Sequence, residues 1–564
     1  MFKTAGLDCQ NDYQYFQLNS TLKGQLRQAE PLVEPCYSDP VGQECSALKA
    51  SIATPFFRAS DYQGFQYLQD EACISKPSDQ CALDPVNLTV PASAQCGQGL
   101  VSSYYVEVTG AQDIQAVFDY AQRYNTTLSI KNSGHDYGMR SSRQGSLALW
   151  TRQLQEKAFH STFTPDGCVV GASGNTSHAL TFGAGVNTDE AISFAHEHDV
   201  VFSAGSANSL GASGGWLLNG GHSAVSNTYG LAVDRVLQFT IVTPDGQVRT
   251  VNKCSNPDLF WALRGSGGGT YGVVLNSTFI AEPESPLTVA MMTFPGTDDN
   301  QRPFVEILAE NMPSWALAGW GGPSGTNLSI LNNPNMDLPD AKVMLAPALE
   351  YVEKQGGNAQ LQSYTSYFDY YVQIINGTFA TPSPVSTATW VTSRIIPETI
   401  FHNNASREKM VDAIFETAAA GVEPLFLATT PFLYGHNNED AANSTSIHPA
   451  WYESVWHVVV SGVQFSESAP LSERKETISL LRNITGKWVA VAPQGCTYPN
   501  EADPWLENWS SEFWGENYPK LLEIKRHIDP SNLLSCWHCV GWDETLPDYG
   551  CIADLRPDNH STRR

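Results

Sequence analysis

Apolar and polar residues follow two rhythms between residues 101 and 155. Residues 101–108 alternate between the two kinds, as a half-buried strand does, whereas residues 113–124 repeat their apolar side chains at the spacing of one helix face. Residues 127–131 and 147–150 are again short apolar runs typical of strands. This order predicts a βαβ unit followed by one more strand.

The stretch up to residue 285 continues to mix short strands with helices. Asn187 or Thr188 is suited to cap a helix, and the turn signal Pro244-Asp245-Gly246 predicts a hairpin. A proline in the turn 255–258 favours a helix start there. The predicted strands are 167–172, 179–183, 238–243 and 247–251, and the predicted helices are 187–199 and 259–264.

From residue 286 to 490, longer helices alternate with longer strands, which predicts an α+β domain with an antiparallel sheet. The predicted strands include 287–294 and 454–464, and the predicted helices are 302–312, 348–355 and 407–420, the last with Ser406 as its N-cap. A final helix, 518–527, should stop before Asp529-Pro530, where proline cannot continue it. Residues 1–95 show little periodicity, and we expect them to wrap on the body as an extension.

Charge excludes whole classes of partner. The 564 residues include 32 Lys and Arg against 58 Asp and Glu, which gives a net charge of −26. Because this balance offers no basic patch to neutralise phosphates, nucleic acids and anionic membranes are not expected partners. No window of about 18 apolar residues predicts a membrane span.

Cysteines and glycosylation sequons indicate an oxidising compartment. Of the 12 Cys, those near the N-terminus predict a disulfide-stapled extension, and Cys536, Cys539 and Cys551 should tie down the C-terminal tail. Residues 1–6 contain no apolar signal core, so we expect a secreted monomer whose signal peptide has been removed. N-glycans are expected at the sequons Asn19, Asn87, Asn125, Asn175, Asn276, Asn327, Asn376, Asn404, Asn443, Asn483, Asn508 and Asn559.

Residues 128–142 carry the strongest chemical signal. Ser133-Gly134-His135 follows an apolar run, and a turn of small residues lets backbone N–H groups converge on an anion. The histidine could be a base, a metal ligand, a covalent anchor or an ordinary turn residue. Two further glycine-rich stretches, 205–221 and 265–272, repeat the pattern, so the three together predict a large phosphate-bearing cofactor.

Other cofactor classes are disfavoured. The glycines of 265–272 follow a helix instead of linking a strand to a helix, which argues against NAD. Cys536 and Cys539 are expected to form a structural disulfide, and because no second pair of ligands completes a zinc motif, no metal is expected.

The sequence of residues 131–137, KNSGHDY, resembles the flavin-attachment segment of the berberine-bridge-enzyme-like branch of the vanillyl-alcohol-oxidase family, whose pattern is R/K-x-x-G-H-x-Y. Further matches follow in the family's order at 214–223, 229–236, 258–269, 498–500, 513–518, 524–526 and 529–530. The resemblance covers about residues 95–285 and 490–545. Within the family the chain is most similar to secreted fungal isoamyl-alcohol-oxidase-like members.

The resemblance implies an α+β protein in which a two-part FAD-binding domain of the PCMH type flanks an inserted α+β substrate domain with an antiparallel sheet. The expected parts are a Cys-rich extension (1–95), a first FAD-binding segment (96–285), the substrate domain (286–489) and a C-terminal FAD-binding segment with a disulfide-tied tail (490–564).

The cofactor that the resemblance implies is FAD, bonded through its 8α-methyl group to His135. Family members often add a bond from a Cys, but residues 204–211 contain none, so a single covalent link is expected. The residues expected to bind FAD are Lys131, Asn132, Ser133, Gly134, His135, Gly138, Arg140, Ser141, Gly205, Ser206, Gly211, Gly214, Gly215, Asn219, Gly220, Gly221, Gly272, Val274 and Asn500.

Tyr498, Tyr137 and His222 are the candidate catalytic residues. The resemblance places Tyr498 beside the flavin, and His222, which follows a glycine pair, would face the ring. Each has an alternative reading: a core tyrosine whose hydroxyl is satisfied, or a histidine that only supports the site through a hydrogen bond. A tyrosine of pKa about 10 acts as a base only where its surroundings lower that value.

The implied function is that of a secreted oxidase. An alcohol-type substrate would lose its hydroxyl proton and pass a hydride to the flavin, and O₂ would be reduced to H₂O₂. A flavin dehydrogenase with another electron acceptor and a catalytically weak binding protein on the same scaffold remain as alternatives. The expected partners are therefore a small-molecule substrate and O₂.

Overall fold

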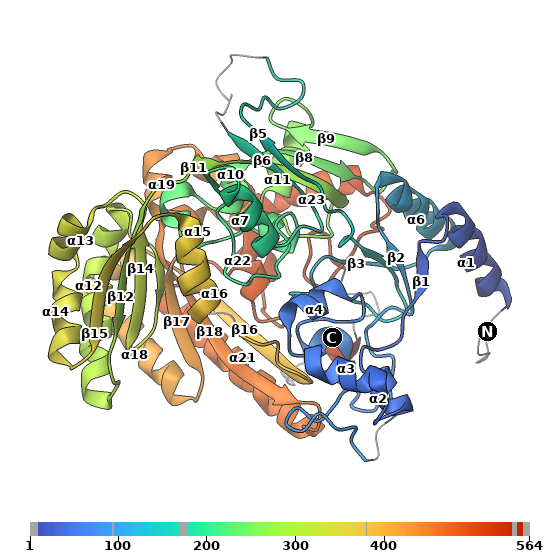
Figure 1. Cartoon of the computed structure of the whole chain (residues 1–564), viewed down its shortest axis with the longest axis horizontal. Helices are drawn as coiled ribbons and strands as arrows, with labels where there is room; N and C mark the ends of the chain where they lie inside the picture. The colour runs from blue at the N-terminus through green and yellow to red at the C-terminus, as the bar shows by residue number, and fades with distance from the viewer. Residues whose placement is uncertain (1–8, 93–94, 170–177, 379–380, 544–549, 556–564) are drawn as a thin grey trace, which may run out of the picture.

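A computed structural model of the chain describes residues 9–92, 95–169, 178–378, 381–543 and 550–555. Within these residues the chain forms two halves that lie side by side (Figure 1). One half contains a four-stranded and a five-stranded sheet, and the other holds a single seven-stranded sheet.

The four-stranded sheet confirms the predicted βαβ unit. Its order is β1 (Leu26–Gln28), β2 (Tyr104–Glu107), β4 (Leu147–Trp150) and β3 (Leu128–Lys131). Both β2 and β3 run parallel to β4, because the helix α6 (Ala111–Tyr124) carries the chain back between β2 and β3. Strand β1 pairs antiparallel with β2, so the N-terminal segment completes this sheet as well as wrapping on it.

Five helices form the rest of the N-terminal segment, at the blue end of the chain in Figure 1. They are α1 (Cys9–Thr21), α2 (Glu34–Ser38), α3 (Gln43–Ser51), α4 (Pro55–Ser60) and α5 (Leu68–Glu71).

The five-stranded sheet is antiparallel and contains the predicted hairpin. Its order is β5 (Lys157–His160), β6 (Ala179–Gly183), β10 (Val273–Ile280), β8 (Val236–Val242) and β9 (Val248–Asn252). The strand predicted at 167–172 is wrong where it can be seen, because residues 167–169 form a turn and an irregular stretch, and 170–172 lie outside the described residues. A separate pair joins β7 (Val200–Val201) and β11 (Glu282–Pro283).

Short helices connect these strands. Asn187 caps the first of them as predicted, since its side chain accepts a hydrogen bond from the Glu190 N–H. The helices are α7 (Thr188–His196), α8 (Gly215–Leu218), α9 (Ser226–Tyr229), α10 (Ala232–Arg235) and α11 (Pro257–Leu263).

The second half is built on the antiparallel sheet that the sequence predicts. Its order is β15 (Asn358–Tyr364), β12 (Leu287–Thr293), β14 (Leu328–Asn333), β13 (Gly322–Ser324), β17 (Glu423–Ala428), β18 (Ser454–Ser466) and β16 (Thr387–Pro397). Four helices pack on this sheet and on one another: α12 (Asp298–Leu317), α14 (Ala346–Lys354), α18 (Asn404–Ala419) and α21 (Leu471–Val491).

Helix α18 starts three residues earlier than predicted. Its N-cap is Asn403, whose Oδ1 accepts hydrogen bonds from the N–H groups of Ala405 and Ser406, so Ser406 lies inside the helix. The smaller helices of this half are α13 (Leu338–Met344), α15 (Tyr367–Tyr370), η1 (Tyr371–Ile375), α16 (Asn376–Thr378), α17 (Thr399–His402), α19 (Phe432–Asn437), α20 (Ala441–Ser444) and η2 (Pro449–Glu453).

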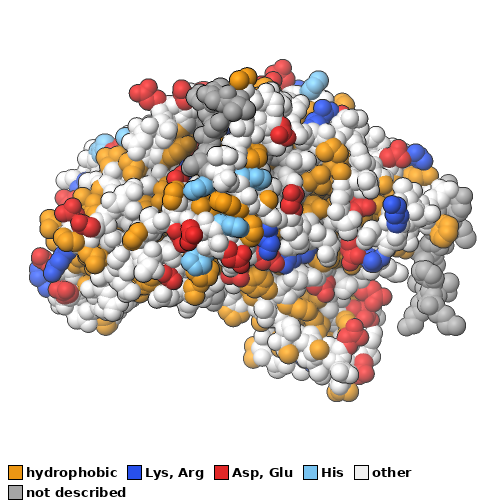
Figure 2. All heavy atoms as spheres, turned by 45° about the horizontal axis from the view of Figure 1, so that its top comes forward, with side chains coloured by type: hydrophobic (Ala, Val, Ile, Leu, Met, Phe, Trp, Pro, Cys, Tyr) orange, Lys and Arg blue, Asp and Glu red, His pale blue; other side chains and the backbone are white. Residues whose placement is uncertain are grey.

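The chain then returns to the first half. Its last elements are η3 (Pro499–Glu501), α22 (Trp509–Trp514), η4 (Gly515–Asn517), α23 (Tyr518–Ile528) and α24 (Gly550–Ala553). Helix α23 ends before Asp529-Pro530, as predicted. Among the described helices, none combines the length and the apolar character that a membrane crossing needs. Figure 2 shows Lys and Arg dispersed among more numerous Asp and Glu side chains on one face.

Five disulfides link the described residues, and one of them joins the two ends of the chain. Cys73 is bonded to Cys551 across 478 positions. Cys536 and Cys539 form the expected disulfide, whereas Cys496 is buried and free among the described residues. The remaining pairs are Cys36–Cys45, Cys81–Cys96 and Cys168–Cys254.

Candidate active site

A cavity with an empty volume of about 1090 Å³, partly open to solvent, runs along the turn after β3. Segments far apart in the sequence form its walls, namely residues near 132–143, 210–219, 268–274 and 534–536. Of the predicted cofactor-binding residues it is lined by Asn132, Ser133, Gly134, His135, Arg140, Ser141, Gly211, Gly214, Gly215, Asn219, Gly272, Val274 and Asn500.

His135 stands at this wall directly after Gly134, whose φ of +79° makes the turn that a side chain would strain. Its Nε2 lies 2.7 Å from the Ser209 hydroxyl. Burial, with a smaller contribution from the Lys131 charge, lowers the pKa of His135 to about 4. The imidazole is therefore neutral near pH 7, and one ring nitrogen keeps its lone pair.

Asn132 holds the attachment turn against the glycine-rich segment. Its amide donates to the Ala184 carbonyl at 2.5 Å, and a Cβ on Gly211 would lie only 1.7 Å from its Oδ1. Gly211 is thus required by contact between protein segments. A Cβ on Gly215 would meet no protein atom within 4 Å, so that glycine leaves open space at the cavity wall.

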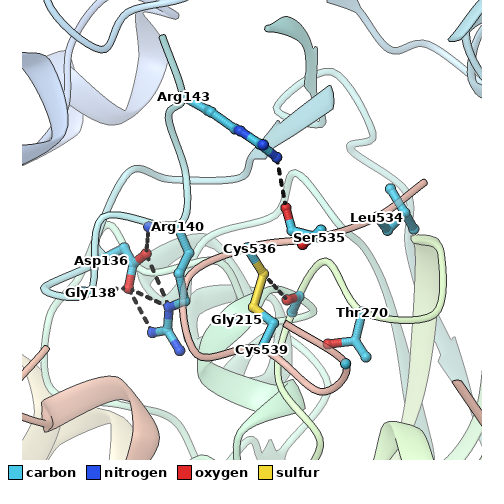
Figure 3. The surroundings of a disulfide bond; sticks show 12 residues. Asp136, Gly138, Arg140, Arg143, Gly215, Thr270, Leu534, Ser535, Cys536 and Cys539 are labelled. Carbon is cyan, nitrogen blue, oxygen red and sulfur yellow. Dashed lines mark hydrogen bonds and ion pairs between the residues drawn. A yellow bond between two sulfur atoms is a disulfide. The ribbon is translucent and has the colours of Figure 1, made fainter. Parts of the chain in front are cut away.

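A polar network crosses the cavity floor from Arg140 to Tyr498. Asp136 accepts from Arg140 Nη2 at 2.6 Å, an ion pair that Figure 3 shows. Arg140 also donates to Asn500 Oδ1 at 3.3 Å, and Asn219 Nδ2 donates to the same oxygen at 2.6 Å.

Asn500 Nδ2 in turn donates to the Tyr498 hydroxyl at 2.8 Å. The buried Oδ1 of Asn219 has no hydrogen-bond partner among the described residues. A polar ligand could satisfy this oxygen, so the cavity offers both space and unused hydrogen-bonding capacity.

Tyr498 lies in a cluster of aromatic and titratable side chains under the seven-stranded sheet. Its ring is 5.4 Å from that of His222 and 5.6 Å from that of His457, both edge-on. Glu501 Oε1 lies 3.3 Å from His222 Nε2, and Glu501 Oε2 lies 3.2 Å from His457 Nε2. Trp451 closes the cluster against Tyr498 at 5.4 Å.

Electrostatics set the protonation of this cluster. Burial raises the pKa of Tyr498 well above its usual value, and the Glu501 charge adds to the shift. Burial would also raise the pKa of Glu501, but the neighbouring imidazoles of His457 and His222 outweigh it and lower that pKa. Tyr498 is therefore a neutral hydrogen-bonding group beside an ionised carboxylate.

Tyr137 lies near this cluster but is paired elsewhere. Its ring stacks on Tyr67 at 4.5 Å, and burial raises the pKa of Tyr137 to about 12. The Glu501 charge adds to that shift.

Neither His457 nor Glu501 is among the residues predicted from the sequence. Glu501 directly follows the Tyr-x-Asn motif, and His457 is the polar residue within a buried stretch of β18, which were the available signals.

Several predicted cofactor-binding residues do not line the cavity. The Lys131 ammonium donates to the carbonyls of Asp61, Tyr62 and Gly64, away from it. Gly205 packs under Trp216, Ser206 is exposed, and Gly138 donates to Asp136. Gly220 and Gly221, both with positive φ, form the turn that leads to His222.

Comparison with known proteins identifies the family. Residues 102–252 match the FAD binding domain family, and residues 497–538 match the family described as berberine and berberine like. The FAD-linked oxidoreductase OXR2 of Pyricularia oryzae is 40% identical over 547 residues, which cover 94% of this chain and 92% of that protein. The chain belongs to the berberine-bridge-enzyme-like branch of the vanillyl-alcohol-oxidase family. The protein is an FAD-linked oxidoreductase.

Solved structures of the family share its fold. The VAO-type flavoprotein MtVAO615 of Myceliophthora thermophila C1 superposes with a TM-score of 0.79 at 25% identity, covering 96% of this chain and 97% of that one. Glucooligosaccharide oxidase of Acremonium strictum, which carries a 6-S-cysteinyl, 8α-N1-histidyl FAD, has a TM-score of 0.61 at 18% identity, covering 78% and 91%. The expected α+β fold with an FAD-binding domain of the PCMH type is confirmed.

Proposed function

We propose that this protein oxidises a small-molecule alcohol with an FAD bonded to His135. The observation that carries the proposal is the neutral imidazole of His135 at the wall of a glycine-lined cavity. A covalent bond to carbon needs the lone pair that a neutral imidazole retains. Because residues 204–211 contain no Cys, the proposal includes one covalent link and not the two of glucooligosaccharide oxidase.

The proposed cofactor site is the cavity described above. Residues 132–135 and the glycines 214 and 215 would hold the flavin nucleotide, and Gly272 and Val274 would contact its adenosine part. When bound, FAD supplies the acceptor for the substrate's hydride. The domain limits at 95/96, 285/286 and 489/490 stay predictions.

The substrate oxygen would lie against His222 and Tyr498. Tyr498 keeps its proton because burial raises its pKa, so its hydroxyl serves to position the substrate and not to take up its proton. His222 can accept the hydroxyl proton, and the ionised Glu501 at 3.3 Å would stabilise the resulting imidazolium. Water exclusion under the sheet would strengthen both interactions.

Secretion is part of the proposal. Six sequon asparagines are exposed in the described structure: Asn87, Asn125, Asn404, Asn443, Asn483 and Asn508. Five disulfides fit an oxidising compartment, and treatment of the protein with an N-glycosidase should lower its mass if glycans are attached.

The decisive experiment is acid precipitation of wild type and His135→Ala. We expect a yellow pellet from wild type, with the peptide that contains residue 135 heavier by one FAD, and a colourless pellet from the variant. His196→Ala, at an exposed histidine paired with Glu284, serves as the control and should stay yellow. A yellow pellet from His135→Ala would reject the anchor.

Substrate turnover tests the second part. Alcohols that bleach the flavin should release H₂O₂ in air if the protein is an oxidase. Bleaching without peroxide would show a dehydrogenase, and no bleaching by any alcohol or saccharide would favour a binding protein.

A further inference from the structure

Three potential ligands meet beneath the seven-stranded sheet from distant parts of the chain. His222 follows α8, His457 lies on β18, and Glu501 ends η3. One ligand atom from each lies within 4.8 Å of the other two. Two imidazoles and a carboxylate are the donor set of several catalytic zinc and iron sites.

Hydrogen bonding accounts for only part of this arrangement, the contact between His222 Nε2 and Glu501 Oε1 at 3.3 Å. His457 is fully buried, and among the described residues neither of its ring nitrogens has a hydrogen-bond partner. Its Nε2 is only 3.2 Å from Glu501 Oε2, yet this oxygen is also unpartnered there, because the ring N–H does not point at it. Buried polar atoms in native proteins are nearly always satisfied, so these unpartnered atoms indicate a missing ligand.

Thr429 orients the second imidazole for the same task. Its Oγ1 lies 3.1 Å from His222 Nδ1, where it can accept the ring N–H. Without an ion, Nε2 pairs with Glu501 Oε1 at 3.3 Å. In the tautomer that donates from Nδ1, Nε2 keeps the lone pair that an ion needs. Metal-binding histidines characteristically donate their other ring N–H in this way.

We propose that His222, His457 and Glu501 bind one divalent transition-metal ion, with Zn²⁺ as the reference ion. Ligand bonds of about 2.1 Å require the three donor atoms to draw together to about 3.5 Å, a small movement for these side chains. His222 and Glu501 are 16% and 21% exposed, so a fourth position remains accessible. Three protein ligands with one open position are typical of catalytic sites.

Tyr498 lies beside these ligands, with its ring 5.4 Å from that of His222 and 5.6 Å from that of His457. The fourth ligand of the ion would be the substrate oxygen, an assignment that rests on the proposed function. With an ion bound, His222 would be a ligand and no longer the base described under the proposed function. The ion would then lower the pKa of the substrate hydroxyl, and the hydroxyl proton would pass to solvent. The sequence predicts no metal, because no second pair of ligands completes a local zinc motif.

Metal retention by the flavin-containing protein tests the inference. The protein is stripped with a chelator, incubated with Zn²⁺, desalted and analysed for zinc by mass spectrometry. We expect one Zn²⁺ per chain in wild type and at least a 100-fold weaker affinity in Glu501→Gln, which keeps the side-chain volume. His402→Ala removes an exposed histidine that pairs with Glu398 at 3.1 Å, and it should bind like wild type.

A second variant keeps all three ligands. Thr429→Val removes only the partner of His222 Nδ1 and should weaken Zn²⁺ binding about 10- to 100-fold. Co²⁺ added to stripped wild type should give visible ligand-field bands that disappear in Glu501→Gln.

Absence of retained zinc in wild type, or equal retention in Glu501→Gln with its flavin spectrum and circular dichroism intact, would overturn the inference. Either result would leave the acid-precipitation test of His135 unaffected.

Discussion

A buried lysine shows how one residue serves the attachment turn without contacting the cofactor cavity. The Lys131 ammonium donates to the carbonyls of Asp61, Tyr62 and Gly64 at 2.5–3.0 Å. Burial lowers its pKa to about 7, although nearby carboxylates oppose the shift. The lysine therefore ties β3 to the N-terminal segment, and a structural role explains why a basic residue opens the motif.

Asp503 makes a pH-dependent contribution to stability. Its Oδ1 accepts from the Trp505 N–H at 2.8 Å, and burial raises its pKa from 3.8 to about 6. The folded protein keeps the Asp503 proton up to about pH 6, whereas the unfolded chain releases it near pH 4. The bound proton therefore stabilises the folded protein fully below about pH 4, and this stabilisation is lost as the pH rises through 6. Asp503→Asn keeps the acceptor and removes the charge.

Between pH 4 and pH 8, the free energy of unfolding of Asp503→Asn should rise by about 3 kcal/mol relative to that of wild type. Urea unfolding at the two pH values measures the difference directly. A variant whose stability follows wild type in parallel would show that the carboxyl has an ordinary pKa in the folded state.

At the scale of elements, two glycines, one before α8 and one at its start, are needed for different reasons. Gly211 is needed because Asn132 approaches it, whereas Gly215 faces open cavity. Gly211→Ala should destabilise the protein by about 2–3 kcal/mol, since the Asn132 bond to Ala184 must break. Gly215→Ala should leave the melting temperature of flavin-free protein within about 2–4 °C of wild type.

Flavin content should rank the two variants in the opposite order to stability. A methyl group on residue 215 would occupy cavity space, so Gly215→Ala should retain less FAD at unchanged stability. Thermal unfolding and the ratio of flavin to protein absorbance distinguish the two variants. Full flavin retention by Gly215→Ala would mean that the cofactor does not use this wall.

Elements with local signals could be predicted from the sequence. Helix α6 has a clean apolar face, the β8–β9 hairpin contains a Pro-Asp-Gly turn, and α23 stops at a proline. Strand β1 could not be predicted, because its three residues, Leu26–Gln28, become a strand only by pairing with β2. The N-cap of α18 lies at Asn403 because its Oδ1 accepts from the N–H groups of Ala405 and Ser406, which places Ser406 inside the helix.

The residues of the site likewise fall into those with a local sequence signal and those without one. His135, Asn132 and Gly215 lie in motifs that could be read directly. His457 could not be assigned, since its contact with Glu501 depends on how β18 and η3 pack together. The approach of such residues is a property of tertiary structure and leaves no spacing in the chain.

At the scale of the molecule, the Cys73–Cys551 disulfide links the N-terminal segment to the C-terminal one. Closing a loop of 478 residues restricts the unfolded chain more than closing the 9-residue loop of Cys36–Cys45. Chain entropy puts the difference at about 3.5 kcal/mol. Cys73→Ser/Cys551→Ser should therefore lower the unfolding temperature more than Cys36→Ser/Cys45→Ser.

Calorimetry of both double variants under non-reducing conditions tests this order. Equal losses would show that local contacts around each bridge, and not loop closure, determine the effect.

The same bond makes the chain between Cys73 and Cys551 a closed ring. A single protease cut anywhere between these two residues would leave both fragments joined, so nicked protein would migrate as one species until it is reduced. The ring also fixes an order of assembly, because it cannot close before Cys551 has been synthesised. The cavity therefore reaches its final, cross-linked form only after the residues up to Cys551 have been synthesised.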